Sequence, residues 1–149
     1  MEILVIGPNP SCIRCTTTAK RAMEVARQLP GTGIEVRSIK IPSPETERYG
    51  KVECGHTIES IGNVEPDFDS MHRLLDELDI LEVDEEKNAS QIDDRLKKLD
   101  EVLAPVRTRA EELGYFMTPV LVVNDKVKSA GYVPAQDEIH RWVQSEISG

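Results

Sequence analysis

The feature that most constrains the fold is a short apolar run that ends in a turn and is followed at once by two cysteines. Residues 2–7 form this run, and Gly7-Pro8-Asn9-Pro10 after it is typical of a turn that ends a buried strand. From Cys15 to Leu29, apolar residues recur at three- and four-residue spacing until Pro30-Gly31, which predicts a helix. Ile34 to Ile41 then alternates apolar and polar residues as a strand does. The chain is therefore predicted to begin with a β-α-β unit.

The C-terminal end has a second and different pattern. Val120 to Val123 and Val127 to Tyr132 are two short runs separated by Asn124-Asp125, which predicts a hairpin. From about Ala135 to Ile147, apolar residues return at helical spacing. This end is therefore predicted to be a β-β-α unit.

The middle of the chain separates these two units. Residues 42–63 are rich in proline, glycine and polar residues without a sustained period, which predicts a long loop. Residues 67–81 and 89–113 each place apolar residues on one helical face, so two amphipathic helices are predicted. Pro105 lies inside the second pattern and is expected to kink or divide that helix.

The charge of the chain is concentrated in the same middle segment. Residues 41–104 hold 18 Asp and Glu against 7 Lys and Arg, although the whole chain has a formal charge of only −9. This acidity argues against nucleic acid or an anionic membrane as a partner. At 149 residues, we expect one domain to which this segment has been added.

The compartment bears on how the cysteines are read. No stretch reaches the length of a membrane span, and the first residues lack the basic start and cleavage site of a signal peptide, so we expect a cytoplasmic protein. A disulfide between Cys12 and Cys15 would close too small a loop to stabilise the fold much. Because cytoplasmic thiols are kept reduced, this pair is expected to be catalytic or metal-binding.

The predicted position of the pair at the start of a helix favours redox chemistry. The positive end of the helix dipole stabilises a thiolate at Cys12, and Arg14 adds a nearby positive charge, although a first-turn arginine is equally often solvated. We therefore expect Cys12 to be the nucleophile. Cys15, one turn into the helix, is expected to act second by attacking the mixed disulfide.

With these parts in order, the sequence resembles the thioredoxin and glutaredoxin superfamily, and is most similar to the small thioredoxin-like proteins with a redox-active disulfide. Met117-Thr118-Pro119-Val120-Leu121-Val122 resembles the family segment in which a cis-proline precedes a strand and faces the cysteines. Gly131-Tyr132-Val133-Pro134 resembles the glycine and the helix start that follow the family's hairpin. The resemblance covers roughly residues 1–41 and 106–147.

The resemblance implies an α/β thioredoxin-like fold, in which helices flank a mixed four-stranded sheet. The whole chain, residues 1–149, is then a single domain with its core at 1–41 and 106–149 and an acidic, mainly helical insertion at 42–105. Thr118 and Pro119 would line the disulfide and bind a substrate segment. The sequence departs from familiar thioredoxins because Ser11 precedes Cys12 and Ile13-Arg14 separates the cysteines, in place of Trp-Cys-Gly-Pro-Cys.

The function expected from these features is a thiol–disulfide oxidoreductase that uses Cys12 and Cys15, with Arg14 as a tuning residue and with no cofactor or metal. Its expected partners are a protein disulfide and an unidentified thiol reductase. The insertion is expected to cover the site, select one partner or build a homodimer. Narrow specificity is favoured over general reduction.

Two alternatives stay open. One is a metal-binding or metal-delivery module that uses the same pair, for which the other candidate ligands are Cys54, His56, His72 and His140. The other is a thioredoxin-like adaptor that binds a partner through the insertion.

Overall fold

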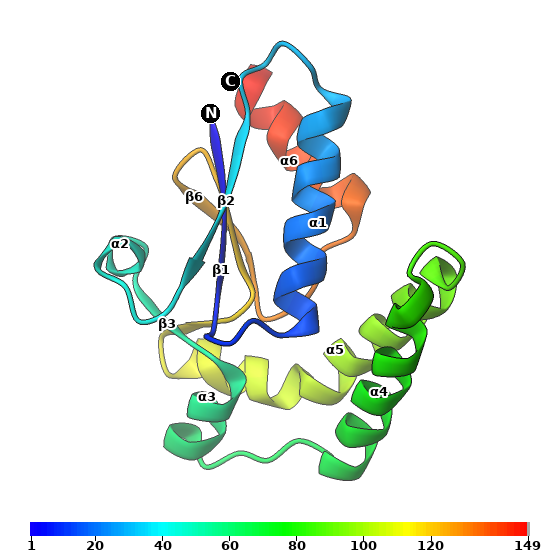
Figure 1. Cartoon of the computed structure of the whole chain (residues 1–149). Coiled ribbons are helices and arrows are strands. Elements are labelled where there is room, and N and C mark those ends of the chain that lie inside the picture. The colour runs from blue at the N-terminus through cyan, green and yellow to red at the C-terminus, as the bar shows by residue number, and fades with distance from the viewer. Residues whose placement is uncertain (149) are drawn as a thin grey trace.

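Four strands form one mixed sheet in the order β2-β1-β5-β6 (Figure 1). The computed structural model describes residues 1–148 and gives these strands the bounds β1 Glu2–Gly7, β2 Glu35–Lys40, β5 Val120–Val123 and β6 Lys126–Ala130. β1 runs parallel to β2 and antiparallel to β5, and β5 runs antiparallel to β6. The predicted mixed four-stranded sheet is confirmed.

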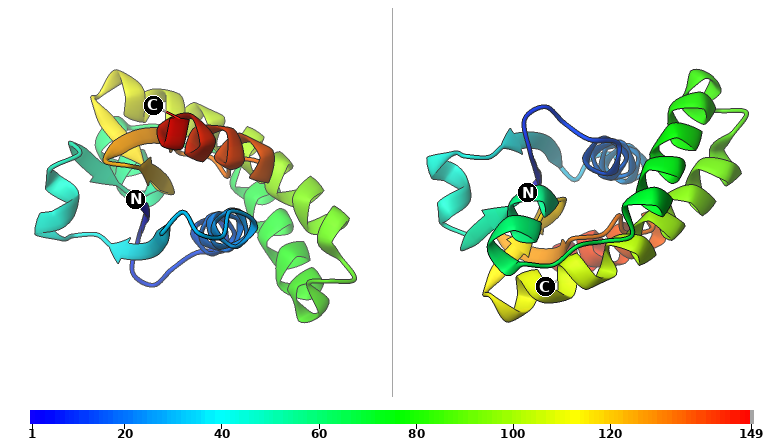
Figure 2. Two further views of the ribbon diagram at one scale, coloured as in Figure 1. Left: turned by 90° about the horizontal axis from the view of Figure 1, so that it is seen from above. Right: turned by 90° about the horizontal axis from the view of Figure 1, so that it is seen from below.

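Helices α1 (Ile13–Gln28) and α6 (Gln136–Ser148) cover one face of this sheet, while α2 lies on the other side (Figure 2). The apolar residues between the sheet and the two helices form one buried cluster, made of Ile3, Val5, Ala22, Val25, Leu121, Val123, Ile139 and Val143. A second cluster lies on the opposite face, made of Leu4, Ile6, Ile39, Val120 and Val122. Alternate residues of β1 and β5 therefore enter two different cores.

The hairpin between β5 and β6 follows from its turn residues. Asn124 and Asp125 have φ angles of 52° and 65°, a left-handed conformation that Asn and Asp tolerate better than most side chains. Two successive left-handed residues give a turn whose twist matches that of the flanking strands. The predicted hairpin and its Asn-Asp turn are confirmed.

The prediction of a long loop over residues 42–63 is wrong. This segment holds α2 (Pro44–Glu47), β3 (Lys51–Glu53) and α3 (Gly55–Gly62). β3 pairs in parallel with β4 (Tyr115–Met117), a strand that the sequence pattern did not predict. Three residues are too few to show an alternation, so only the pairing of two distant segments defines these strands.

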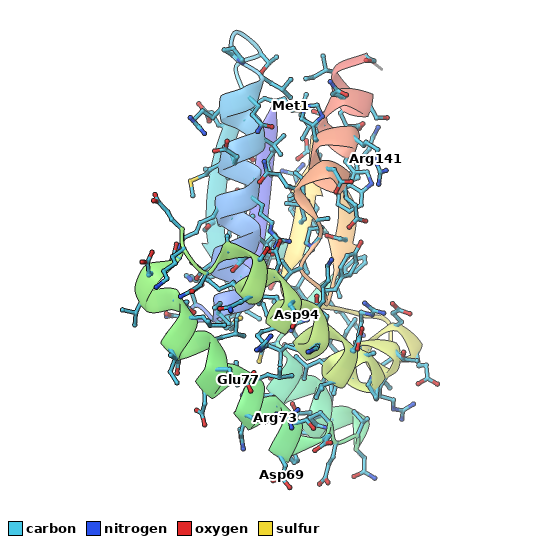
Figure 3. All side chains as sticks on the ribbon, turned by 90° about the vertical axis from the view of Figure 1, so that its right-hand side faces the viewer. Met1, Asp69, Arg73, Glu77, Asp94 and Arg141 are labelled. Carbon is cyan, nitrogen blue, oxygen red and sulfur yellow. The ribbon has the colours of Figure 1, made fainter. Side chains whose placement is uncertain are left out.

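The two predicted amphipathic helices are confirmed as α4 (Phe68–Leu81) and α5 (Ala89–Glu112), joined by the short helix η1 (Glu82–Asp84). They pack on each other and on α3 around a third apolar cluster, which includes Leu78, Leu99 and Met117. Asp69, Arg73 and Glu77 follow one another along the surface of α4 (Figure 3).

Pro105 does not divide α5, which is one continuous helix from Ala89 to Glu112. Leu103 and Val106 on either side of the proline are buried, and their packing offsets the hydrogen bond that proline cannot make. The boundary at residues 105/106 that was drawn between insertion and core therefore falls inside α5. Among residues 1–148, no helix is both long and apolar enough to cross a membrane.

Candidate functional site

The two cysteines lie at the start of α1. This helix follows the loop after β1 (Figure 1). Cys12 is the N-cap residue of α1 and Cys15 lies in its first turn, so the helix brings their side chains to the same end. Their sulfur atoms are 3.4 Å apart, and both are free thiols. Cys12 is partly exposed, whereas only 4% of Cys15 is exposed. The outer cysteine is thus accessible and the inner one is shielded.

Gly7, at the end of β1, makes room for the inner thiol. A Cβ atom at this position would lie 2.8 Å from the Sγ atom of Cys15, which is closer than real Cβ contacts occur. The absence of a side chain at Gly7 therefore lets the thiol pack directly against the strand. The sequence pattern indicated only a turn at this glycine, because the close approach depends on how α1 packs on the sheet.

The two thiols have pKa values displaced in opposite directions. A hydrogen bond from the thiol of Cys15, helped by the backbone of Cys15 and the charge of Arg14, outweighs burial and lowers the pKa of Cys12 from 9.0 to about 6. The same hydrogen bond, together with burial and the negative charge of Cys12, raises the pKa of Cys15 well above its usual value. One thiolate and one thiol therefore share the site at neutral pH.

Arg14 is buried, which rules out the alternative of a solvated first-turn arginine. Its Nε atom donates to Oδ1 of Asp100 at 3.0 Å, and its guanidinium also donates to the backbone carbonyl of Gly131. Only 8% of the Arg14 side chain and 15% of the Asp100 side chain are exposed. Its positive charge is one of the causes that lower the pKa of Cys12, although a smaller one than the hydrogen bond from Cys15.

Asp100 belongs to α5 and contacts two segments of the core. While Oδ1 accepts from Arg14, Oδ2 accepts from the backbone N–H of Val133 at 3.0 Å. Burial raises the pKa of Asp100 above its usual value, and the positive charge of Arg14 opposes this rise. The carboxylate therefore ties the residue between the two cysteines to the segment after β6.

Thr118 and Pro119 lie between β4 and β5, and their peptide bond is cis, as the resemblance implies. The Thr118 N–H donates to the carbonyl of Glu53 at 3.0 Å, so β3 already occupies this backbone donor. The Pro119 carbonyl accepts from the N–H of Gly131 at 3.1 Å. Among residues 1–148, no hydrogen bond joins Thr118 or Pro119 to either cysteine; Gly131 links Pro119 to Arg14 instead.

The third cysteine and the histidines form no metal centre with the pair. Cys54 is the N-cap residue of α3, one position after Glu53, and its Sγ atom lies 3.5 Å from the hydroxyl of Thr57. Within the described part of the chain, no group of three or more His, Cys, Asp or Glu side chains is placed to hold a metal ion. As arranged here, Cys12 and Cys15 supply two ligands, whereas a structural zinc site has four.

The sequence interpretation missed the role of Asp100, although a signal for it exists. Asp93 and Asp100 are seven residues apart on α5, and Arg14 and Arg21 are seven residues apart on α1. Seven residues make about two helical turns, so each pair lies on one face of its helix. In the structure, Arg14 pairs with Asp100 and Arg21 pairs with Asp93. Glu53 and Gly131 contribute backbone carbonyls, for which the side-chain pattern contains no signal.

Comparison with known proteins finds a match to a protein family. The family model for the thioredoxin domain matches residues 87–144, which include all of α5, the strands β4, β5 and β6, and most of α6. This stretch contains Thr118 and Pro119, whereas Cys12 and Cys15 lie outside it. No curated protein and no solved structure matches the chain. The mixed four-stranded sheet flanked by helices agrees with the match, and together they support a thioredoxin-like assignment.

Proposed function

We propose that the protein is a thiol–disulfide oxidoreductase that exchanges two electrons with a disulfide bond of a protein substrate. Cys12 is the attacking thiol, Cys15 is the resolving thiol, and the pair itself carries the electrons without an organic cofactor. The proposal treats residues 1–41 and 106–149 as the core of a single domain and residues 42–105 as its insertion. It places the protein in the cytoplasm, where thiols are kept reduced.

The observation that carries this proposal is the opposite displacement of two thiol pKa values across a sulfur–sulfur distance of 3.4 Å. With a pKa of about 6, Cys12 is mostly a thiolate at neutral pH, and the thiolate is the form that attacks a disulfide. The raised pKa of Cys15 keeps this thiol protonated until the mixed disulfide with Cys12 has formed. The pair therefore has a nucleophile and a protected second thiol within reach of each other.

The reaction balances in two exchange steps. The Cys12 thiolate attacks one sulfur of the substrate disulfide, which forms a mixed disulfide and releases the other substrate sulfur as a thiolate. Cys15 then loses its proton to solvent and attacks the sulfur of Cys12, so the Cys12–Cys15 bond forms as the bond to the substrate breaks. The substrate gains two electrons and, from water, two protons. A thiol reductase returns two electrons to the oxidised pair.

Thr118 and Pro119 are proposed to contact the substrate segment beside the thiols. Because the N–H of Thr118 already donates to Glu53, the proposed contacts use the Thr118 carbonyl and the Pro119 ring. A substrate segment that binds here also meets β3, which belongs to the insertion. This neighbour supports a narrow choice of substrate over general disulfide reduction.

The test is the redox equilibrium of the purified, metal-stripped protein in a series of dithiothreitol and glutathione buffers. Alkylation followed by mass spectrometry counts the free thiols at Cys12, Cys15 and Cys54 separately. We expect Cys12 and Cys15 to titrate together as one two-electron couple, between roughly −120 and −270 mV as in known thiol oxidoreductases. The Cys54→Ser variant is the matched control and is expected to give the same midpoint.

The metal-binding alternative predicts the opposite result for the same samples, namely that the two cysteines do not form a disulfide. If the pair forms no disulfide except under extreme oxidant, and if added zinc blocks alkylation of both thiols, the oxidoreductase proposal is wrong. A Cys12→Ser, Cys15→Ser double variant that keeps the cellular function would instead favour the adaptor alternative.

A further inference from the structure

The geometry points to Asp100 as a positioning residue for the thiol pair, which acts on Cys12 by holding and neutralising Arg14. This inference rests on the proposed thiol chemistry of Cys12 and adds a residue from the insertion to the site. It gives part of the insertion a defined chemical role, because the carboxylate that faces the cysteine motif comes from α5.

The contacts of Asp100 are those of a buried carboxylate with fixed partners, and not those of a surface ion pair. Both of its oxygens are used, one by Arg14 and one by the Val133 N–H, each at 3.0 Å. Arg14 in turn donates to the Gly131 carbonyl, and Gly131 donates to the carbonyl of Pro119. A continuous set of hydrogen bonds therefore runs from α5 through the residue between the cysteines to the cis-proline.

A second ion pair joins the same two helices, but its carboxylate is not buried as that of Asp100 is. Arg21 and Asp93 join α1 to α5 two turns away, but 57% of the Asp93 side chain is exposed, against 15% for Asp100. Solvent screens the exposed pair, whereas the buried pair acts in a medium of lower dielectric. The charge of Asp100 is therefore felt more strongly by its neighbours than that of Asp93.

Electrostatics gives the direction of the effect on Cys12. Two groups act on the Cys12 thiolate: the positive charge of Arg14 stabilises it, and the neutral thiol of Cys15 forms a hydrogen bond with it. Asp100 is in contact with Arg14, and Arg107 is the other positive charge that acts on Asp100. The negative charge of Asp100 offsets part of the charge of Arg14 and keeps its guanidinium directed toward Gly131. Asp100 thus limits how far Arg14 favours the thiolate over the thiol.

The experiment measures the rate of Cys12 alkylation from pH 4 to 9 in the full-length reduced protein, with the Asp100→Asn variant compared with the parent. Asparagine has the shape of aspartate and keeps one oxygen that can accept, whereas its NH2 group only donates, so the change removes the charge and one of the two accepted hydrogen bonds. We expect the midpoint of Cys12 ionisation to fall by about half a pH unit, because one compensating charge beyond Arg14 is lost. At pH 7 this corresponds to a roughly threefold shift of the dithiol–disulfide equilibrium toward the dithiol.

Two further variants separate positioning from general damage. Asp93→Asn removes an acid from the same helix that also pairs with an arginine of α1, and it is expected to leave the midpoint unchanged. In an Arg14→Gln background, Asp100→Asn is expected to move the midpoint by less than half as much as in the parent, because the arginine through which it acts is gone. Thermal unfolding of each variant records any loss of fold.

Three results would contradict this role of Asp100. An unchanged midpoint in Asp100→Asn, an equal shift in Asp93→Asn, or an equal shift in the Arg14→Gln background would each overturn the role of Asp100. These readings use alkylation alone and do not require that the pair form a disulfide. A parent protein that never forms the Cys12–Cys15 disulfide therefore refutes the proposed function and leaves this test of Asp100 intact.

Discussion

The central sheet and the segment proposed as an insertion, residues 42–105, bury their apolar residues in different ways. In the sheet, all residues of Ile3–Ile6 and Val120–Val123 are buried, because both faces of β1 and β5 are covered. In the insertion, α4 and α5 bury only every third or fourth residue, and charged side chains occupy the remaining surface. The strands thus have no free face for polar groups, whereas each helix can present a polar residue beside its apolar stripe.

This difference explains how the candidate site is assembled. The candidate groups of the site come from the segment that follows β1 and from the segment that precedes β5. Both segments lie outside the fully buried strands. Asp100 lies one position after the buried Leu99 on α5 and reaches Arg14 from the edge of the apolar stripe. The core therefore supplies the thiols, and the insertion supplies groups that contact their neighbours. The following experiments test that division.

The largest effect is expected from the core thiol, in comparison with the cysteine of the insertion. Cys12→Ser is expected to slow the reduction of a disulfide-containing peptide by on the order of 100-fold or more, because a serine hydroxyl does not replace a thiolate nucleophile. Cys54→Ser is expected to leave the rate within about twofold. The measurement is the rate of thiol release under a fixed concentration of dithiothreitol. A comparable loss in Cys54→Ser would show that the cysteine of the insertion also takes part in the reaction. The two regions would then not differ in this respect.

The two ion pairs between the regions are expected to differ strongly in their effect on stability. Arg14→Ala leaves the buried Asp100 carboxylate without its partner and is expected to lower the free energy of unfolding by about 3–5 kcal/mol. Arg21→Ala leaves Asp93 largely in solvent and is expected to cost about 1 kcal/mol or less. Urea denaturation at pH 7 measures both values. Equal losses would mean that burial does not distinguish the two contacts.

Matched cavities in the two regions test whether they unfold together. Leu121 in the sheet and Leu78 in the insertion are both fully buried. Each Leu→Ala change is expected to cost about 2–5 kcal/mol. Because Met117 and Val133 of the core belong to the insertion's apolar cluster, both variants are expected to keep one cooperative transition. A separate early transition in Leu78→Ala would show that the insertion unfolds independently.

The last expected effect is the dependence of stability on pH that Cys12 contributes, which is gradual because it is spread over three pH units. Its pKa is about 6 in the folded protein and 9.0 when unperturbed, so between these values the unfolded chain binds a proton that the folded chain has lost. Stability of the reduced protein is therefore expected to rise with pH from about 6 to 9, by at most about 1.4 kcal/mol per pH unit, and this contribution is lost as pH falls through 6. Cys15 contributes an opposite slope only near pH 9 and above, where the unfolded thiol ionises while the raised pKa keeps the folded thiol protonated.

The measurement is the free energy of unfolding of the reduced protein at several pH values, with Cys12→Ser as the control. The difference between the two proteins isolates the contribution of the thiol. A difference that stays flat between pH 6 and 9 would contradict the lowered pKa of Cys12.

Local sequence patterns were enough for much of the fold. The strand at residues 2–7, the following helix, the hairpin at Asn124-Asp125 and the amphipathic helices were all predicted, because each depends on neighbours within a few positions. The adjacency of Cys12 and Cys15 was predictable for the same reason, since helical geometry alone brings them together. The start of the helix after the turn also predicts a lower pKa at Cys12 than at Cys15, the direction that the structure gives.

Contacts between distant segments were decided by the tertiary structure alone. β3 and β4 are three residues each and exist because they pair across more than sixty positions of sequence. Arg14 and Asp100 are 86 positions apart, and whether the arginine meets solvent or a buried carboxylate depends on where α5 packs. The amino-acid sequence by itself determined the adjacency of the two cysteines and the elements that carry them. Packing decided the surroundings of that pair, because burial and pairing arise only when separate elements exclude water between them.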